Sequence, residues 1–230
     1  MSDMAVPPPQ DGGPAYAEGR LADEFFLMAH DDESGRTRLP ERITGLGLAA
    51  ALLGELALKE RIELRAGLLE VPPRTGDSSA APDALTARVL QYLDAEQHPV
   101  RTWLAFFART ARDDVAGRLA AAGAVAYKPR RRPWQPDGWV PTSPDVGTLP
   151  AARLVTQLMR GRPLSEQQTV LVGLLRATGL DEVILWEVRE SAPETARHLA
   201  DEIAALKPSL TELISQTEAA VGAAIASHRT

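Results

Sequence analysis

The sequence predicts a mainly α-helical protein: a compact helical domain with one or two β-hairpins, one of them a protruding basic and aromatic hairpin. Three observations support this fold class. Apolar residues recur at helical spacing along most of the chain. Twice a helical pattern ends in a glycine or turn and leads into two short segments typical of a hairpin. The composition, 44% hydrophobic and 24% charged over 230 residues, is sufficient for a buried core.

The chain divides into a leader and one folded domain. Residues 1–19 are rich in proline and glycine and contain too few apolar side chains to offset the entropy of ordering, so we expect a disordered leader. Residues 20–230 are expected to form a single helical domain. It begins with a short helix around Phe25 and Phe26, followed by a polar turn that ends at Gly35.

The strongest helical pattern covers residues 43–59. Because its leucines and alanines leave little polar surface, we expect this helix to be buried at the centre of the domain. The chain then alternates as a strand up to residue 64, turns at residues 65–67 and returns at residues 68–71, which predicts a first hairpin. Residues 72–82 are interpreted as a surface loop.

Helical patterns fill the rest of the chain apart from a second hairpin. Three helices are expected before that hairpin, at residues 83–96, 100–107 and 109–122, the last ending at Gly123. Five are expected after it, at residues 149–162, 165–178, 180–189, 193–206 and 209–227. Ser165 and Ser209 are expected to cap two of these helices.

The second hairpin concentrates cations and tryptophans in a chain whose formal net charge is −6. Its candidate membrane-contacting residues are Lys128, Arg130, Arg131, Arg132, Trp134 and Trp139. The dipeptide at residues 137–138 favours a turn, which would place both tryptophans near the tip. Cations there can meet lipid phosphates, and indole rings prefer the interfacial layer of a bilayer. The same residues could instead pack on the domain itself or on a second copy of the chain.

Simple energetics limit what this hairpin can do alone. A basic residue near an anionic leaflet contributes about 1 kcal/mol, so its cations supply roughly 4 kcal/mol, and partial burial of two indoles adds about 2 to 3 kcal/mol. The resulting dissociation constant, on the order of tens of micromolar, is too weak for stable residence on a membrane. We therefore expect a specific headgroup contact, or a homo-oligomer that presents several hairpins to one surface.

Composition excludes several classes of protein. The absence of cysteine removes disulfides, thiolate nucleophiles and cysteine metal sites. The histidines are scattered, and no phosphate loop, metal pair or nucleophile elbow is present, so we expect neither an enzyme nor a metal or other cofactor. Without a signal peptide or a run of about 18 apolar residues, the expected location is cytoplasmic and any membrane contact peripheral. The negative net charge disfavours nucleic acid as a partner.

Two blocks of sequence resemble the Golgi phosphoprotein three (GPP34-like) family. The first block comprises residues 35–37 (GRT), 43–46 (ITGL) and 52–64 (LLGELALKERIEL). The second, at residues 109–125 (RTARDDVAGRLAAAGAV), resembles the family's arginine-bearing helix and the glycine before its hairpin. The likeness extends over nearly everything after residue 19. The abundance of proline and alanine is consistent with a bacterial, actinobacterial-type member.

The resemblance implies a non-enzymatic, mostly helical adaptor at the membrane periphery. Members of the family bind phosphatidylinositol 4-phosphate in a basic pocket and insert a neighbouring hairpin, and eukaryotic members also retain Golgi glycosyltransferases. The family's two helix arginines match Arg109 and Arg112, which could share a phosphate. The pocket tryptophan falls at Pro40 and a further arginine at Ala49, so half of the family's pocket is replaced.

Other cations could restore the charge that these two replacements remove. Arg38 and Arg42 lie close in sequence to the replaced tryptophan position and complete our set of candidate headgroup-binding residues. The plainer interpretation of the helix is a solvated face on which Arg109 pairs with Asp113, and Asp114 with Arg118, at a spacing of four residues.

Two other functions use the same features. A helix followed by a basic hairpin is also the shape of a winged-helix DNA-binding regulator, although residues 43–59 are too apolar to enter a groove. Asp113 and Asp114 would also face the DNA phosphates. The third possibility is a protein-interaction module that self-associates through the hairpin. The sequence identifies no client protein, and it leaves the lipid's identity open.

Overall fold

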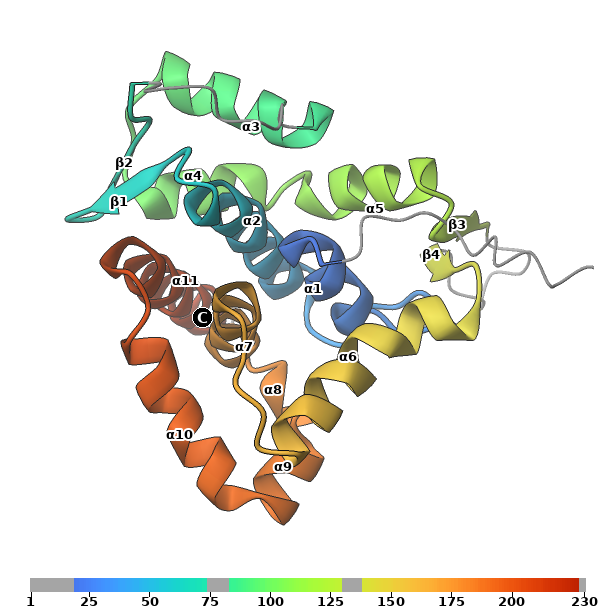
Figure 1. Ribbon diagram of the computed structural model, residues 1–230. Coiled ribbons are helices and arrows are strands. Elements are labelled where there is room, and N and C mark those ends of the chain that lie inside the picture. The colour runs from blue at the N-terminus through green and yellow to red at the C-terminus, as the bar shows by residue number, and fades with distance from the viewer. Residues whose placement is uncertain (1–18, 74–82, 130–137, 228–230) are drawn as a thin grey trace, which may run out of the picture.

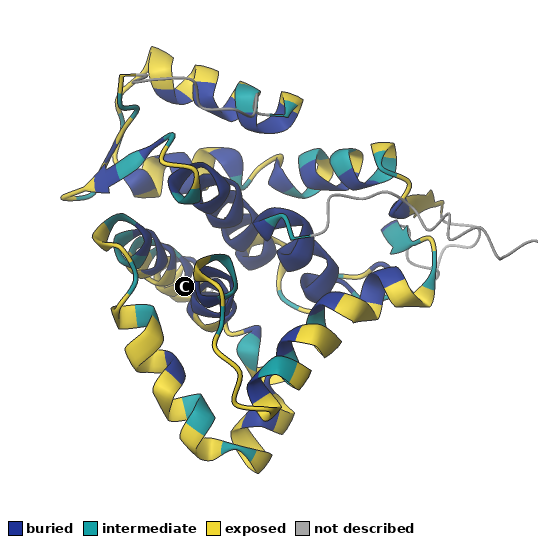
Figure 2. Ribbon diagram, viewed as in Figure 1, coloured by how far each residue is buried: buried dark blue, intermediate teal, exposed yellow. Residues whose placement is uncertain are grey.

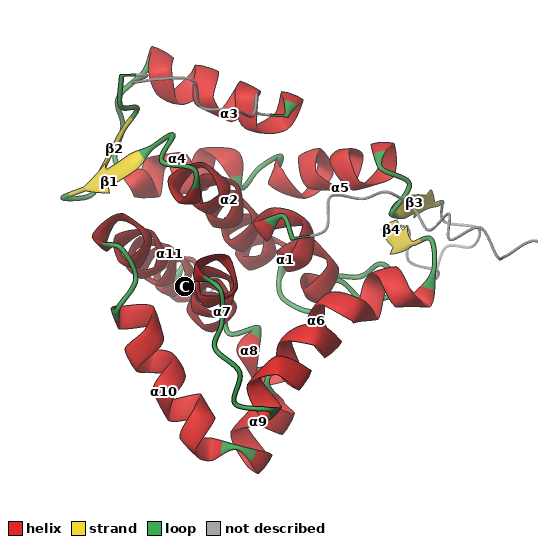
Figure 3. Ribbon diagram, viewed as in Figure 1, coloured by secondary structure: helices red, strands yellow, loops and turns green. Residues whose placement is uncertain are grey.

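The computed structural model describes residues 19–73, 83–129 and 138–227. Within these ranges the chain is mainly helical, with two small antiparallel hairpins, which confirms the predicted fold class (Figure 3). The elements are α1 (Leu21–Ala29), α2 (Glu41–Leu58), β1 (Glu63–Arg65), β2 (Leu68–Glu70), α3 (Ala84–Ala95), α4 (Val100–Phe107), α5 (Ala111–Ala121), β3 (Val125–Lys128), β4 (Gly138–Pro141), α6 (Pro144–Met159), α7 (Glu166–Thr178), α8 (Asp181–Ile184), α9 (Trp186–Ser191), α10 (Pro193–Ala204) and α11 (Pro208–Ala226).

Some predicted features lie outside the described residues. These are nearly all of the leader, most of the loop at residues 72–82, and the tip of the second hairpin with Arg130, Arg131, Arg132 and Trp134. No helix in the described ranges is both long and apolar enough to cross a membrane.

Helix α2 lies at the centre of the fold, as the sequence predicts (Figures 1 and 2). Every residue from Ile43 to Ala57 is buried, and α1, α4, α5, α7 and α11 all pack on it. Two of its glycines allow this close packing. A Cβ at Gly45 would lie 2.5 Å from the carbonyl oxygen of Ala108, and one at Gly47 would lie 2.3 Å from the ring of Phe25. The helix therefore sets the positions of its neighbours.

The first hairpin forms where the sequence predicts it. Leu64 pairs with Leu69, and the two residues between the strands, Ala66 and Gly67, both have positive φ, as a tight hairpin turn requires. In the second hairpin Lys128 pairs with Gly138 and Val125 with Pro141. Figure 3 shows this pair of strands beyond the C-terminal end of α5.

A tight turn supports the base of the second hairpin. Gly35 has a φ of 66°, in the left-handed region, and a Cβ there would lie 2.7 Å from the carbonyl oxygen of Trp139. Only glycine fits both the backbone conformation and this close approach. The polar turn predicted before residue 35 therefore also positions β4.

Several predicted helix ends are wrong. Helix α5 begins at Ala111 rather than at residue 109, so Arg109 lies in the turn between α4 and α5. Helix α6 begins at Pro144 rather than at residue 149, because Pro144 suits the first turn of a helix. Residues 180–189 form two short helices, α8 and α9, because the backbone leaves helical geometry at Leu185.

Of the two predicted caps, one is confirmed and one is wrong. Ser165 caps α7 in a capping box with Gln168. Ser209 does not cap α11, because its hydroxyl accepts a hydrogen bond of 2.8 Å from the backbone N–H of Leu64 in β1. The hydrogen bond to β1 therefore takes the place of the expected bond between Ser209 and the first turn of α11.

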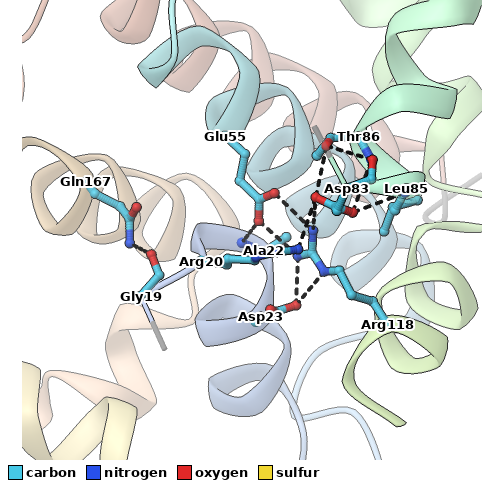
Figure 4. Close-up of polar contacts among 10 residues, drawn as sticks. All are labelled: Gly19, Arg20, Ala22, Asp23, Glu55, Asp83, Leu85, Thr86, Arg118 and Gln167. Carbon is cyan, nitrogen blue, oxygen red and sulfur yellow. Dashed lines mark hydrogen bonds and ion pairs between the residues drawn. The ribbon is translucent and has the colours of Figure 1, made fainter. Parts of the chain in front are cut away.

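A buried cluster of charged side chains surrounds the guanidinium of Arg118 (Figure 4). Its Nε donates to Oδ1 of Asp23 at 2.9 Å, and Nη1 and Nη2 donate to the carboxylate of Glu55 at 3.0 and 2.9 Å. Asp83 Oδ2 lies 3.7 Å from Nη1. The Asp23 and Glu55 side chains are only 2% and 4% exposed, so water screens these interactions weakly. The cluster joins α1, α2 and α5.

Backbone groups and a second arginine extend this cluster. Oε1 of Glu55 accepts a hydrogen bond of 2.9 Å from the backbone N–H of Ala22, in the first turn of α1. Asp83 pairs with Arg20 at 3.0 Å and caps α3 by accepting from backbone N–H groups in its first turn. The carboxylates of Glu55 and Asp83, which surround Arg118, therefore also bind backbone N–H groups at the N-termini of α1 and α3.

Burial controls the protonation of the cluster. Desolvation raises the pKa of Asp23 to about 6, and the charge of Arg118 only partly opposes this shift. For Arg118, burial alone would lower the pKa, but the hydrogen bonds and charges of Glu55 and Asp23 outweigh it and hold the pKa above its ordinary value. The cluster therefore contains a permanent cation and an aspartate that titrates in an unusually high range.

Removing the central cation should destabilise the fold strongly. We expect Arg118→Met to lower the free energy of unfolding by about 3 to 5 kcal/mol, because two buried carboxylates lose their partner. Arg88→Met is the matched control. It removes a half-exposed arginine that pairs with Asp114, and should cost less than about 1 kcal/mol. Urea unfolding followed by circular dichroism measures both, and equal losses would contradict the prediction.

The raised pKa of Asp23 predicts a distinctive pH dependence. The folded-state pKa of about 6 lies above the ordinary value of 3.8, so between these values the folded protein holds a proton that the unfolded chain has released. Stability contributed by this group should be greatest below that window, fall by up to about 3 kcal/mol as the pH rises through it, and then level off.

Asp23→Asn isolates this contribution. Asparagine keeps an oxygen acceptor for Arg118 but cannot ionise, so the variant should gain stability relative to the wild type as the pH rises through the same window. Urea unfolding at a series of pH values gives the difference directly. Parallel pH profiles for the two proteins would show that Asp23 does not titrate in this way.

Candidate functional site

A surface pocket of about 640 Å³ lies where three parts of the fold meet. The N-terminus of α2 forms one side, α4 and the start of α5 form another, and the C-terminal half of α11 forms the third. Its lining residues are Glu41, Arg42, Gly45, Leu46, Arg101, Ala105, Ala108, Arg109, Arg112, Asp113, Ala220 and Ala223. Small residues form much of this lining, and the charged side chains stand around them.

Four arginines and two acids line this arginine pocket. The Arg112 side chain is 29% exposed, and its Nη1 lies 3.4 Å from Oε1 of Glu41, whose side chain is 81% exposed. The Nε of Arg112 is buried and has no hydrogen-bond partner in the described part of the chain. Arg112 thus uses little of its donor capacity within the protein, which leaves it able to bind an external anion.

The other three arginines keep their charges available. Arg42 donates to the hydroxyl of Ser227 at 2.9 Å, and Arg101 donates to the amide oxygen of Gln216 at 3.1 Å. These partners are neutral, so they orient the guanidinium groups without neutralising them. No hydrogen bond or ion pair joins the Arg109 side chain to any other residue that the structure describes. An excess of positive charge therefore faces one pocket.

Three of the four predicted headgroup-binding residues meet in the arginine pocket, namely Arg42, Arg109 and Arg112. Arg38 does not line it. Its Nε donates to the carbonyl oxygen of His30 at 3.1 Å, and its Nη1 lies 4.0 Å from the carboxylate of Asp31. Arg38 is therefore committed to the turn between α1 and α2.

Sequence reasoning missed Arg101. It lies on α4, whereas Arg109 follows that helix, so no regular spacing in the sequence links the two, and only the packing of α4 beside α2 and α11 brings Arg101 to the pocket. The positions that the resemblance marks as replaced behave differently: Ala49 is fully buried in the core, whereas Pro40 is exposed at the N-terminus of α2. Besides Arg109 and Arg112, the pocket takes its cations from Arg42 and Arg101.

The predicted salt bridges along α5 are wrong. Asp114 pairs with Arg88 of α3 at 2.5 Å, and Arg118 points into the buried cluster. Within the part of the chain that the structure describes, Asp113 forms no ion pair with Arg109, because Arg109 precedes the helix and does not share its regular spacing. Arg109 is therefore not neutralised by its sequence neighbour.

The described part of the second hairpin lies at the other end of α5. Lys128 is exposed, and its Nζ donates to the carbonyl oxygen of Glu33 at 3.4 Å. Trp139 is partly buried against the core and meets the ring of Tyr127 edge-on, with centroids 5.4 Å apart. Tyr127, 52% exposed, is thus the more accessible aromatic residue of this pair.

His30 is buried close enough to Arg112 for the charge of the arginine to affect its pKa. The pKa of His30 is lowered to about 4, mainly by desolvation. The hydrogen bond between Nδ1 and the Phe26 carbonyl opposes this shift, whereas the charges of Arg112 and Arg38 contribute to it. His30 is therefore neutral at physiological pH and adds no cation to this region.

These features define a class of protein: a mainly helical protein with a central buried helix, two small hairpins and an arginine-lined surface pocket. The family model described as Golgi phosphoprotein 3 (GPP34) matches residues 21–223. This match covers most of the chain, so the chain belongs to the Golgi phosphoprotein 3 family. A search of curated proteins found no match.

Proposed function

We propose that this chain is a non-enzymatic, peripheral membrane adaptor of the cytoplasm that binds the phosphorylated headgroup of an anionic phospholipid, similar to phosphatidylinositol 4-phosphate. The observation that carries the proposal is the convergence of Arg42, Arg101, Arg109 and Arg112 on one pocket. Family membership supports it, because the sequence resemblance associates this family with that lipid.

The chemistry of the arginine pocket suits a phosphate monoester. A guanidinium presents several N–H donors in a planar fork that matches phosphate oxygens, and such charge-assisted hydrogen bonds are stronger than neutral ones. The volume of about 640 Å³ is in the usual range for a small-molecule site and would admit a sugar-phosphate headgroup. No cofactor is needed for this role.

The carboxylates of Glu41 and Asp113 favour a ligand that carries more than one negative charge. Both carboxylates line the pocket, so a weakly charged anion would gain little from it. A phosphate monoester carries close to two negative charges at neutral pH and would compete better with Glu41 for Arg112. This favours a phosphorylated headgroup over one that carries only a phosphodiester.

The DNA-binding alternative receives less support. Helix α2 is buried from Ile43 to Ala57 and has no face available for a groove. Self-association through the second hairpin remains compatible with the proposal, because an oligomer would present several arginine pockets to one membrane. We propose such a homo-oligomer as the membrane-bound form. A client protein would then bind elsewhere on the surface.

Substitution of the two central arginines tests the proposal. We expect Arg109→Ala/Arg112→Ala to weaken binding to vesicles containing phosphatidylinositol 4-phosphate by about 100-fold, because several charge-assisted hydrogen bonds are lost. Binding to vesicles of phosphatidylcholine, alone or with phosphatidylglycerol, should be weak for both proteins. Co-sedimentation in the presence of excess duplex DNA measures these affinities, and DNA should not displace the protein.

The matched control is Arg160→Ala/Arg162→Ala, which removes the same charge from exposed arginines that line a different pocket. This variant should bind like the wild type. Equal weakening in both variants would indicate nonspecific attraction to anionic vesicles. Absence of wild-type binding to every vesicle would reject the membrane function.

A further inference from the structure

Two aromatic side chains lie exposed next to the arginine pocket. Tyr92 of α3 and Phe106 of α4 are 46% and 41% exposed, and their rings meet edge-on with centroids 5.3 Å apart. Beneath them are the buried rings of Trp103 and Phe107, each within 5.8 Å of Phe106. Packing from below therefore holds this exposed pair in place, in contrast to a single apolar residue at the surface.

Arginines surround this pair, which we call the aromatic rim. A hollow of about 270 Å³ is lined by both rings together with Arg88 and Arg109. Arg88 is paired with Asp114, whereas Arg109 also lines the arginine pocket. Arg109 thus joins the rim to the pocket, so a molecule held in the pocket would have the two rings beside it.

The combination of exposed rings and arginines matches the chemistry of a bilayer interface. Aromatic side chains favour the layer between headgroups and acyl chains, and adjacent cations interact with lipid phosphates. The anionic ligand expected in the arginine pocket makes this match specific, because a lipid headgroup bound there would bring its own acyl chains close to Tyr92 and Phe106.

We propose that the aromatic rim enters the interfacial layer of an anionic bilayer when the arginine pocket holds a lipid headgroup. This inference rests on the proposed function. It assigns a membrane-facing surface to α3 and α4, on helices separate from the β3–β4 hairpin in which the sequence predicts the membrane contact. It also fixes how the protein is oriented on the bilayer, because Arg109 lies between the arginine pocket and the aromatic rim.

The cysteine-free sequence permits a direct test, because a single introduced cysteine can be labelled with nitrobenzoxadiazole. We would label Tyr92→Cys and Phe106→Cys, with Trp186→Cys as the matched control. Trp186 is 56% exposed on α9, which Figure 1 shows well apart from α3 and α4. The vesicles contain phosphatidylcholine, phosphatidylglycerol and phosphatidylinositol 4-phosphate.

Labels at positions 92 and 106 should shift to shorter emission wavelengths on vesicles and be quenched by nitroxide-bearing lipids, whereas the label at position 186 should not change. Vesicle binding without a shift at position 92 or 106 would overturn the inference and leave the headgroup pocket intact. A shift that occurs without vesicles and grows with protein concentration would identify a second copy of the chain as the occupant, which also overturns it.

Unlabelled variants separate this surface from the pocket. Tyr92→Ala/Phe106→Ala should bind vesicles about tenfold more weakly, with unchanged affinity for soluble inositol 1,4-bisphosphate in calorimetry. Trp186→Ala should leave both affinities unchanged. If the soluble headgroup binds but the rim variant keeps full vesicle affinity, the inference fails alone. If neither the soluble headgroup nor the vesicles bind the wild type, the proposed function fails with it.

Discussion

The buried ion cluster around Arg118 is the constraint on which the rest of the structure depends. One guanidinium binds carboxylates from α1 and α2, and a third carboxylate at the start of α3 lies within 4 Å of it. Because Arg118 lies six residues, less than two turns, along α5 from Arg112, fixing Arg118 also fixes the direction in which α5 begins. The first turn of α5 then reaches the N-terminus of α2, where Arg112 meets Glu41. The arginine pocket is thus a consequence of buried electrostatics elsewhere in the fold.

Close packing between α2 and the turn after α4 also positions the residues of the arginine pocket. Gly45 lets the turn after α4 approach the backbone of α2, which brings Arg109 to the same pocket as Arg42. A larger residue at that position would separate the two helices and widen the pocket. The chain carries a net charge of −6, yet four arginines gather at this one place. Such a local excess of positive charge attracts anions that the protein as a whole would repel.

The sequence predicts the helices well because apolar periodicity is a local property, and α2 was identified as central for the same reason. The contacts that define the site are not local. Asp23 and Glu55 are 95 and 63 residues away from Arg118, so a pair at a spacing of four residues was the only partner that sequence could suggest. Arg101 was missed for a similar reason, since only the fold brings α4 beside α2 and α11. The family resemblance, rather than any pattern, identified Arg109 and Arg112.

Helix α5 connects two surfaces that each combine an aromatic residue with a cation. Phe106 and Arg109 lie before its first turn, and Tyr127 and Lys128 follow its last. A flat bilayer can touch both ends of a helix only where nothing bulky protrudes between them. On the exposed face of α5 the intervening positions are Asp113, Gly117 and Ala121, and a Cβ at Gly117 would contact nothing within 4 Å. Asp113 belongs to the lining of the arginine pocket, and beyond it this face carries only small residues. The pocket end and the hairpin end of α5 could therefore approach one membrane together, so that two individually weak contacts would add to each other.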